Sequence, residues 1–371
     1  MENEFLSKVE DNATVHALSG RLQLERGDSL AEGYFWNSAY KCFTFGKVDL
    51  VPTIEEYTTL LKCPKIQVQK TYAWVFSSQT FVNKLMSIFG MSEPWVTARI
   101  QQKGDSKCIP WENLRDFILT HPDEKKRVDI FALSIYGLVI FPKALRHVDE
   151  AVIDLIDRLE KGITPVPSIL AEMLRSLSSC RKVGEGRFIG CAQLLMAWFH
   201  GHFWKNLKEG DIEWRAYWMV PNEIMYRCGN FDWVPLLGIW GATGYTPLLA
   251  LRQYNLRQFV PTTYGLAQSE FSFKGARYKK RVRELSDAWK QTCWMKRLAV
   301  GSMVTPKYNE WFKKRLNDNI PKPSLENARP IGEQLQVAPS ELEIIRQDFE
   351  KKSSELGKKI EQLEEEKVHR D

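Results

Sequence analysis

The 371-residue chain has few of the features that mark secreted or membrane proteins. Its seven cysteines are scattered, odd in number and without a CxxC pair, which argues against a disulfide scaffold. Five charged side chains within residues 1–11 exclude the apolar core of a signal peptide there. The charge-free runs 130–142, 188–204 and 233–251 are too short to span a bilayer or are interrupted by histidine, glycine or proline. We therefore expect an intracellular protein with no membrane span.

A complete catalytic signature is also absent from the sequence. No serine has the GxSxG elbow, and no cysteine carries a recognisable protease motif. The stretch 184–190 misses the spacing of a dinucleotide-binding loop by one place, and no Gly-Lys-Ser/Thr follows it. Gly238, Gly241 and Gly244 recur without a basic neighbour, which predicts close backbone packing rather than phosphate binding. We expect no enzyme activity and no cofactor.

Two clusters contain residue types that could bind a metal or transfer protons, but neither has the spacing that such a site needs. His200 and His202, with Cys191 or Cys180, could suggest zinc, but alternate residues of a helix point apart, which favours core or near-core histidines. Four carboxylates lie mostly away from the apolar stripe of their helix, and a solvated face is predicted. These carboxylates are Asp149, Glu150, Asp154 and Asp157. No catalytic or metal-binding residue is assigned.

Apolar and aromatic side chains are abundant. Hydrophobic residues make up 44% of the chain, and 13 Trp, 12 Tyr and 19 Phe can offset the entropy lost when the backbone is ordered. Residues 40–51 predict a hairpin or bent strand, and Thr53 with Glu56 has the spacing of a capping box. Apolar periodicity predicts helices near 54–61, 81–88, 111–118, 148–159, 169–177 and 190–204. The predicted fold class is mainly α, a helical globular body with a small N-terminal β element and a C-terminal coiled-coil helix.

Composition divides the chain into four predicted segments. They are an N-terminal segment 1–33, a helical body 34–316, a proline-containing linker 317–340 and a coiled coil 341–371. In the last segment, apolar residues recur at intervals of seven among many Glu and Lys, which predicts self-association through a helical seam. The seam residues are Leu342, Phe349, Leu356 and Leu363. The alternative is a single solvated helix.

The basic charge is concentrated near the end of the body. Lys and Arg exceed Asp and Glu by 52 to 46, and residues 274–297 hold a dense basic cluster. Lys279, Lys280, Arg281 and Arg283 could neutralise phosphates and so contact nucleic acid. The alternative is a solvated helix face, because Trp289 falls at core spacing and is predicted to pack.

Several stretches are similar to a known plant family. They are Phe35–Tyr57 with Lys62–Pro64, Lys107–Trp111, Phe131–Pro142, Gly186–Gln193 and Tyr226–Trp240. On these residues the chain resembles, over most of 34–367, an uncharacterised plant domain related to the plant mobile domain (aminotransferase-like) family. The resemblance implies association with transposable elements, a nuclear role and a coiled coil after the body, and it brings no catalytic residue set.

One departure from this family falls near residue 206. A longer insertion is expected between residues 202–205 and 211–214, where only Asn206–Gly210 stand. Taken together, the residues and the resemblance predict a non-enzymatic, transposon-derived interaction platform that oligomerises through its C-terminal coiled coil. A nucleic-acid-binding module that uses residues 274–297 is the alternative, and an enzyme with a novel site ranks last.

Overall fold

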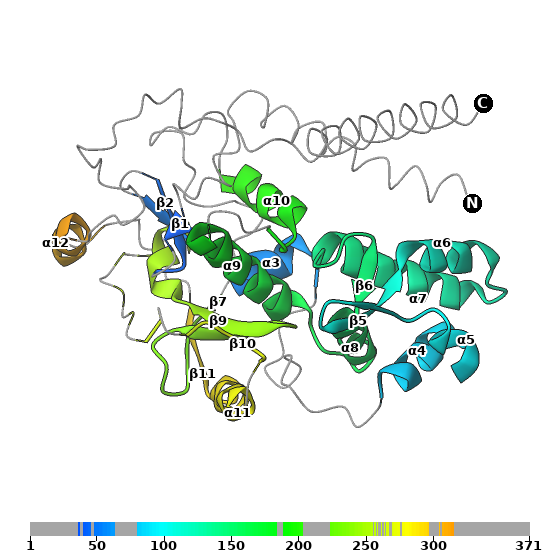
Figure 1. Ribbon diagram of the computed structural model, residues 1–371. Coiled ribbons are helices and arrows are strands. Elements are labelled where there is room, and N and C mark those ends of the chain that lie inside the picture. The colour runs from blue at the N-terminus through cyan, green and yellow to red at the C-terminus, as the bar shows by residue number, and fades with distance from the viewer. Residues whose placement is uncertain are drawn as a thin grey trace, which may run out of the picture. The chain divides into compact units, whose positions relative to one another are not determined.

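The computed structural model describes residues 36–37, 40–45, 48–63, 80–183, 188–202, 223–254, 277–296, 304 and 306–314, together with 256–274 with gaps. The chain divides into two compact units, Met1–Ile320 and Pro321–Asp371, and every described residue belongs to the first (Figure 1). The predicted N-terminal segment 1–33, the linker 317–340 and the coiled coil 341–371 lie outside the described residues.

The described residues form a mixed α/β fold, so the prediction of a mainly α body was wrong. About 53% of them are helical and about 20% lie in strands, which form four small antiparallel sheets. The strands are two to six residues long. So short a strand shows little of the alternating pattern by which a sequence reveals a strand.

The first sheet confirms the predicted N-terminal hairpin. Strands β1 (Trp36–Asn37), β2 (Cys42–Phe45) and β3 (Val48–Leu50) pair in that order. Helix α3 (Ile54–Leu60) follows, and its start confirms the predicted capping box. The Glu56 amide donates to the Thr53 hydroxyl and the Thr53 amide to the Glu56 carboxylate, each at 3.3 Å.

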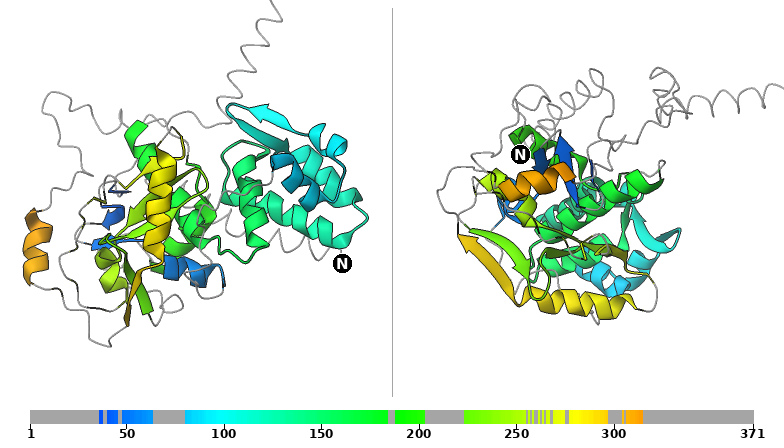
Figure 2. Two further views of the ribbon diagram at one scale, coloured as in Figure 1. Left: turned by 90° about the horizontal axis from the view of Figure 1, so that it is seen from below. Right: turned by 90° about the vertical axis from the view of Figure 1, so that its left-hand side faces the viewer.

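Residues 80–163 form a lobe of helices around one sheet, here called the α4–α8 lobe (Figure 2). Its helices are α4 (Phe81–Phe89), α5 (Glu93–Thr97), α6 (Trp111–Thr120), α7 (Glu124–Ile135), the π-helix η2 (Tyr136–Ile140) and α8 (Glu150–Leu159). Its strands are β4 (Gln101–Lys103), β5 (Ser106–Pro110) and β6 (His147–Asp149). The left-handed Gly90 ends α4 as predicted, whereas Val148 belongs to β6 and not to the following helix.

The remaining described elements include the other two sheets, one of which is rich in glycine. They are α9 (Val166–Val183), α10 (Ala192–His202), β7 (Glu223–Cys228), β8 (Val234–Leu237), β9 (Gly241–Tyr245), the 3-10 helix η5 (Pro247–Tyr254), β10 (Phe271–Ser272), α11 (Tyr278–Trp289), β11 (Thr292–Lys296) and α12 (Pro306–Lys314). Strand β9 lies between β8 and β10, while β7 pairs with β11. Helices α9 and α11 both pack on β8, and Figure 1 shows the sheet between them.

Close packing of the predicted glycines is confirmed. A Cβ at Gly238 would overlap the Glu172 carboxylate, and one at Gly244 would overlap the Trp233 ring. The β8–β9 hairpin therefore lies directly against α9 and against its own preceding tryptophan. Of the helices in the described ranges, none combines the length and the apolar character that a transmembrane helix needs.

Candidate functional site

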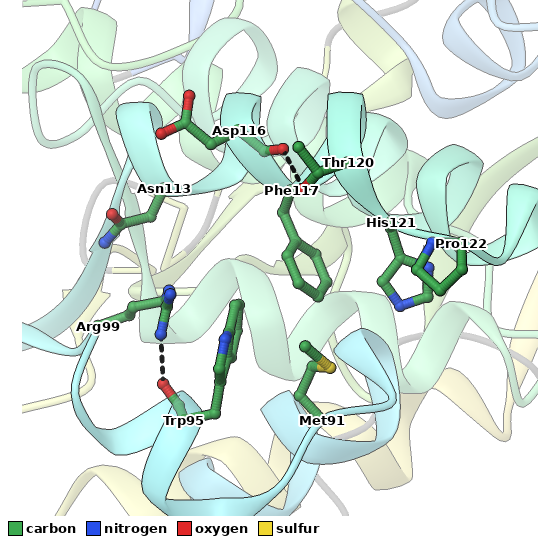
Figure 3. Close-up of a pocket in the computed structure, with 9 residues that line it drawn as sticks. All are labelled: Met91, Trp95, Arg99, Asn113, Asp116, Phe117, Thr120, His121 and Pro122. Carbon is green, nitrogen blue, oxygen red and sulfur yellow. Dashed lines mark hydrogen bonds between the residues drawn. The ribbon is translucent and has the colours of Figure 1, made fainter.

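A half-open pocket of about 240 Å³ lies between α5 and α6 (Figure 3). Its floor is aromatic, because the Trp95 and Phe117 rings pack with their centroids 4.5 Å apart. The Arg99 guanidinium lies 3.5 Å from the centroid of the Trp95 ring and donates to the Trp95 carbonyl at 3.0 Å. The full lining is Met91, Trp95, Arg99, Asn113, Asp116, Phe117, Thr120, His121 and Pro122.

The polar groups of this pocket are held by backbone atoms. The Asp123 amide donates to His121 Nδ1 at 3.0 Å, and the Thr120 hydroxyl donates to the Asp116 carbonyl at 2.8 Å. His121 Nδ1 is therefore occupied as an acceptor, and the Thr120 proton is used within its helix. The aromatic floor suits contact with an apolar or aromatic side chain.

Exposed apolar side chains are concentrated in the same lobe as this pocket. Six large apolar side chains are exposed among the described residues, and five of them lie between residues 119 and 145. They are Leu119, Val128, Ile135, Val139 and Leu145, and the sixth is Trp294 of β11. Val128, Ile135 and Val139 follow one side of α7 and η2 and, with the half-buried Ala132, are here called the α7 face. An apolar surface of this kind is typical of a contact with another protein.

A buried polar cluster anchors the start of α3. Glu56, which is 2% exposed, accepts hydrogen bonds from Trp198 Nε1 at 2.7 Å, His202 Nε2 at 3.1 Å and Gln253 Nε2 at 3.0 Å. The hydroxyls of Thr53 and Tyr254 also share a hydrogen bond. Since these partners come from α10 and η5, the cluster joins segments far apart in the chain.

Glu55 lies beside this cluster in a less favourable environment. Burial raises the pKa of Glu55 to about 7, although the Met225 amide, which donates to Oε1 at 2.7 Å, opposes this shift. Its Oε2 is buried and accepts no hydrogen bond from the described residues. Glu55 is only 7% exposed, so it lies away from solvent-borne substrate, and we interpret it as a structural carboxyl group.

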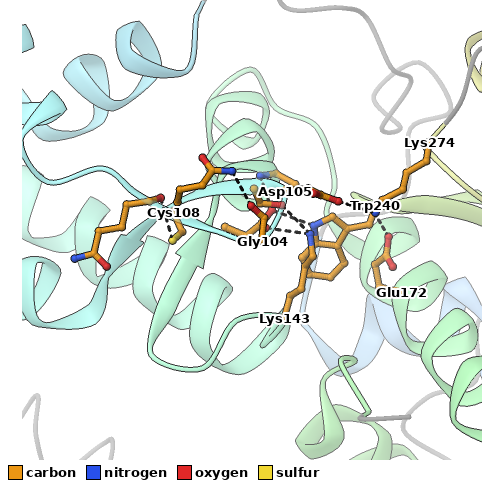
Figure 4. Close-up of polar contacts among 12 residues, drawn as sticks. Gly104, Asp105, Cys108, Lys143, Glu172, Trp240 and Lys274 are labelled. Carbon is orange, nitrogen blue, oxygen red and sulfur yellow. Dashed lines mark hydrogen bonds and ion pairs between the residues drawn. The ribbon is translucent and has the colours of Figure 1, made fainter. Parts of the chain in front are cut away.

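A third polar group connects the α4–α8 lobe with the β8–β9 hairpin (Figure 4). Trp240 Nε1 donates to Asp149 Oδ1 at 3.0 Å, and the Trp240 amide donates to Glu172 Oε1 at 2.7 Å. Lys143 Nζ lies 3.1 Å from Asp149 Oδ2 and 5.0 Å from the centroid of the Trp240 ring. Burial raises the pKa of Glu172, while the Arg175 guanidinium opposes the shift. Trp240 is therefore held from both sides.

The prediction that Asp149, Glu150, Asp154 and Asp157 form a solvated face was partly wrong. Asp149 and Asp157 are 3% and 8% exposed, and Asp154 pairs with Lys84 and Arg158. The reason is tertiary, because α4 packs on α8 and Trp240 covers Asp149. The sequence around these carboxylates does not indicate that Lys84 and Trp240, which are far away in the chain, will pack against them.

The two histidines have different environments. His202 is fully buried against Glu56 and Trp198, which confirms a core histidine. His200 is exposed, so its predicted core position was wrong. In the part of the chain that the structure describes, no three histidine, cysteine or acidic residues are grouped to hold a metal ion.

The basic residues proposed for nucleic acid all lie on α11 and are exposed. They are Lys279, Lys280, Arg281 and Arg283. The opposite side of α11 is buried, and Trp289 Nε1 donates to the Pro235 carbonyl at 2.8 Å, which confirms the packing role of Trp289. The Arg281 guanidinium lies 3.9 Å from the centroid of the Phe271 ring, so this cation packs against an aromatic ring of the protein itself.

Comparison with protein families assigns most of the chain. A family model described as "Domain of unknown function (DUF7745)" matches residues 21–317, which is more than half of the chain. Comparison with curated proteins found no match, and comparison with solved structures found none. The match spans the pocket, the α7 face, the buried cluster and α11. The chain therefore belongs to the family described as domain of unknown function DUF7745.

Proposed function

We propose that the protein is a non-enzymatic interaction platform that oligomerises through its C-terminal segment 341–371. The observation that supports a platform is the concentration of exposed apolar side chains at residues 119–145. Soluble surfaces with clustered apolar side chains commonly bind other proteins. The seam Leu342, Phe349, Leu356 and Leu363 supplies the spacing for oligomerisation, and it lies outside the described residues.

Sedimentation equilibrium of the full chain tests the seam. Leu356→Glu and Phe349→Glu should each lower the average mass, because a charge in an apolar seam opposes helix pairing. Ser354→Glu adds the same charge off the seam and should leave the mass unchanged. A mass that is the same for the wild type and both seam variants would contradict oligomerisation through this segment.

Nucleic-acid binding by α11 is a second candidate function. It is favoured by Lys279 and Arg283, which lie one turn apart on the exposed side of the helix. Acidic neighbours reduce the basic character of this side, since Lys280 lies 4.0 Å from Glu284 and Lys290 lies 2.6 Å from Asp287. This candidate therefore ranks below the interaction platform.

Filter binding over a salt series tests the second candidate. The doubly substituted Lys279→Glu/Arg283→Glu chain should bind single-stranded DNA more weakly, with a salt slope reduced by about one for each lost phosphate contact. Lys103→Glu changes an exposed lysine of β4 and should have no such effect. Affinity that does not change with salt in the wild type would remove nucleic-acid binding as a function.

The wider kinship is part of the proposal as well. We propose that the chain is related to the plant mobile domain proteins, is associated with transposable elements and acts in the nucleus. This proposal is supported by the stretches between residues 35 and 240 that resemble the plant family named above. A fluorescent fusion of the full chain in plant cells tests the nuclear location, and signal confined to the cytoplasm would contradict it.

A further inference from the structure

We infer that the pocket between α5 and α6 binds an acidic peptide segment of a partner protein, with one aromatic side chain of that segment on the pocket floor. The inference rests on the proposed platform function, for which it names a class of partner, and it is independent of segment 341–371. The pocket volume of about 240 Å³ is below the roughly 300–1,000 Å³ of most small-molecule sites. The pocket therefore accommodates one large side chain rather than a whole cofactor.

The rings on the pocket floor form a continuous row. The centroids of Trp95 and Phe117 lie 4.5 Å apart, and those of Phe117 and His121 lie 4.8 Å apart. The buried Phe89 ring packs edge-on against two of them, 6.2 Å from Trp95 and 5.5 Å from Phe117. Because these rings hold one another in place, they form a preformed surface against which a further aromatic ring can pack.

A cation lies at one end of this row. The Arg99 guanidinium covers a face of the Trp95 ring and donates from Nη1 to the Trp95 carbonyl, so its position is fixed. Arg99 makes no other hydrogen bond within the described ranges, and its remaining N–H groups can bind a carboxylate. The same positive charge disfavours an ammonium group as the ligand of this aromatic floor.

Two further hydrogen-bond donors border the pocket. The Asp123 amide donates to His121 Nδ1, so the hydrogen of the neutral imidazole lies on Nε2, which can donate to a ligand. The Asn113 side chain lies at the same end of the pocket as Arg99 and has no hydrogen-bond partner among the described residues (Figure 3). These donors favour a ligand that brings acceptors, above all carboxylate oxygens.

One lining residue carries the opposite charge. The Asp116 carboxylate points away from the rings in Figure 3 and pairs with Arg115 at 3.2 Å, with 66% of its side chain exposed. Solvent and Arg115 therefore screen this charge, whereas Arg99 lies directly on the aromatic floor. The neighbouring Asp123 carboxylate accepts from two backbone amides at the start of α7. The charge that meets a bound ring is thus positive.

Calorimetric titration of the full chain with three blocked pentapeptides tests the class of ligand. They are acetyl-Gly-Glu-Phe-Glu-Gly-amide, its analogue with alanine in place of phenylalanine, and its analogue with lysine in place of both glutamates. The first should bind, and the other two should each bind at least about tenfold more weakly, because one lacks the ring and the other the carboxylates. Equal dissociation constants for the three peptides, or no binding of the first, would overturn the inference.

Two variants locate the peptide in this pocket. Arg99→Gln removes the charge on the floor and should weaken binding of the first peptide about tenfold. Asn113→Ala removes a second donor without changing the Trp95 contact and should weaken binding about threefold or more, so the test does not depend on one variant. Arg146→Gln, the control, changes an arginine of the same lobe that is 72% exposed and lies outside the pocket lining. Unchanged affinity in both pocket variants, or an equal loss in the control, would contradict the assignment.

Phenylacetate separates a peptide from a small aromatic acid. It has the ring and the carboxylate but no peptide backbone, so it should bind at least about tenfold more weakly than the first peptide. Equal or tighter binding of phenylacetate would overturn a peptide as the occupant. A chain that binds no peptide but oligomerises through segment 341–371 would overturn this inference and leave the proposed platform in place. A monomeric chain that binds the first peptide would instead contradict the C-terminal seam.

Discussion

At the scale of single residues, buried carboxyl groups distinguish this protein. Glu55 and Glu56 are neighbours in sequence, yet Glu56 accepts hydrogen bonds from three side chains and Glu55 leaves one oxygen without a described donor. A buried carboxyl group without donors is stabilised by protonation, whereas one with several donors is stabilised as an anion. Burial without a full set of donors therefore makes Glu55 a group that couples stability to pH.

Glu55 should make the protein less stable as the pH rises. Its pKa is about 7 in the folded chain and near 4.5 in a model peptide. Well below pH 4.5 the Glu55 carboxyl group is protonated in both the folded and the unfolded chain, so it adds no pH dependence to the stability. Between pH 4.5 and pH 7, Glu55 is ionised in the unfolded chain but still protonated in the folded chain. The free energy of unfolding therefore falls as the pH rises, by up to about 3 kcal/mol. Above pH 7 this loss is complete.

Urea unfolding at pH 5 and pH 8 checks this prediction. Glu55→Gln should be more stable than the wild type at pH 8 and should show a smaller difference between the two pH values. Glu310→Gln, at an exposed position of α12, is the control and should keep the wild-type difference. Identical pH dependence in the wild type and Glu55→Gln would contradict the assignment.

At the scale of elements, most helices and the N-terminal hairpin were predictable, whereas the other sheets were not. Helix α3 and helix α4 carry their start signals in adjacent residues, and the periodicity of their apolar side chains is local. Strand β7 pairs with β11, and β10 with β9, across long intervals of chain that no local pattern reveals. Most of the α7 face lies in the charge-free run 130–142, but the sequence does not show that it is exposed, because exposure depends on which side of a helix its neighbours cover.

The two threonine caps should differ in their contribution to stability. Thr80→Ala removes the cap of α4, an exposed hydrogen bond from the Asn83 amide, and should cost about 1 kcal/mol. Thr53→Ala also leaves the buried Tyr254 hydroxyl without this partner, which should add about 1–3 kcal/mol. Chemical denaturation followed by circular dichroism measures both. Equal losses would mean that the Thr53–Tyr254 contact contributes nothing.

At the scale of the whole described unit, Trp240 couples the α4–α8 lobe to the β8–β9 hairpin. Trp240→Phe keeps an aromatic ring but removes the donor to Asp149, and should lower the free energy of unfolding by about 1–3 kcal/mol. Hydrogen exchange should quicken at the start of α8, where Asp149 caps the helix by accepting from the Ala151 amide. Trp294→Phe, at an exposed site on β11, should change stability by no more than about 0.5 kcal/mol. Unchanged exchange in Trp240→Phe would argue against coupling.

The partners of α3 also set an order for synthesis on the ribosome. Gln253 and Tyr254 lie 197 and 201 residues after the groups that they bind at Glu56 and Thr53. At about 5–20 residues per second, the first turn of α3 waits roughly 10–40 s before η5 is made. The α4–α8 lobe, which ends near residue 163, can fold during that interval. The N-terminal strand β3 and the start of α3 therefore gain their contacts with η5 only after the α4–α8 lobe has been made.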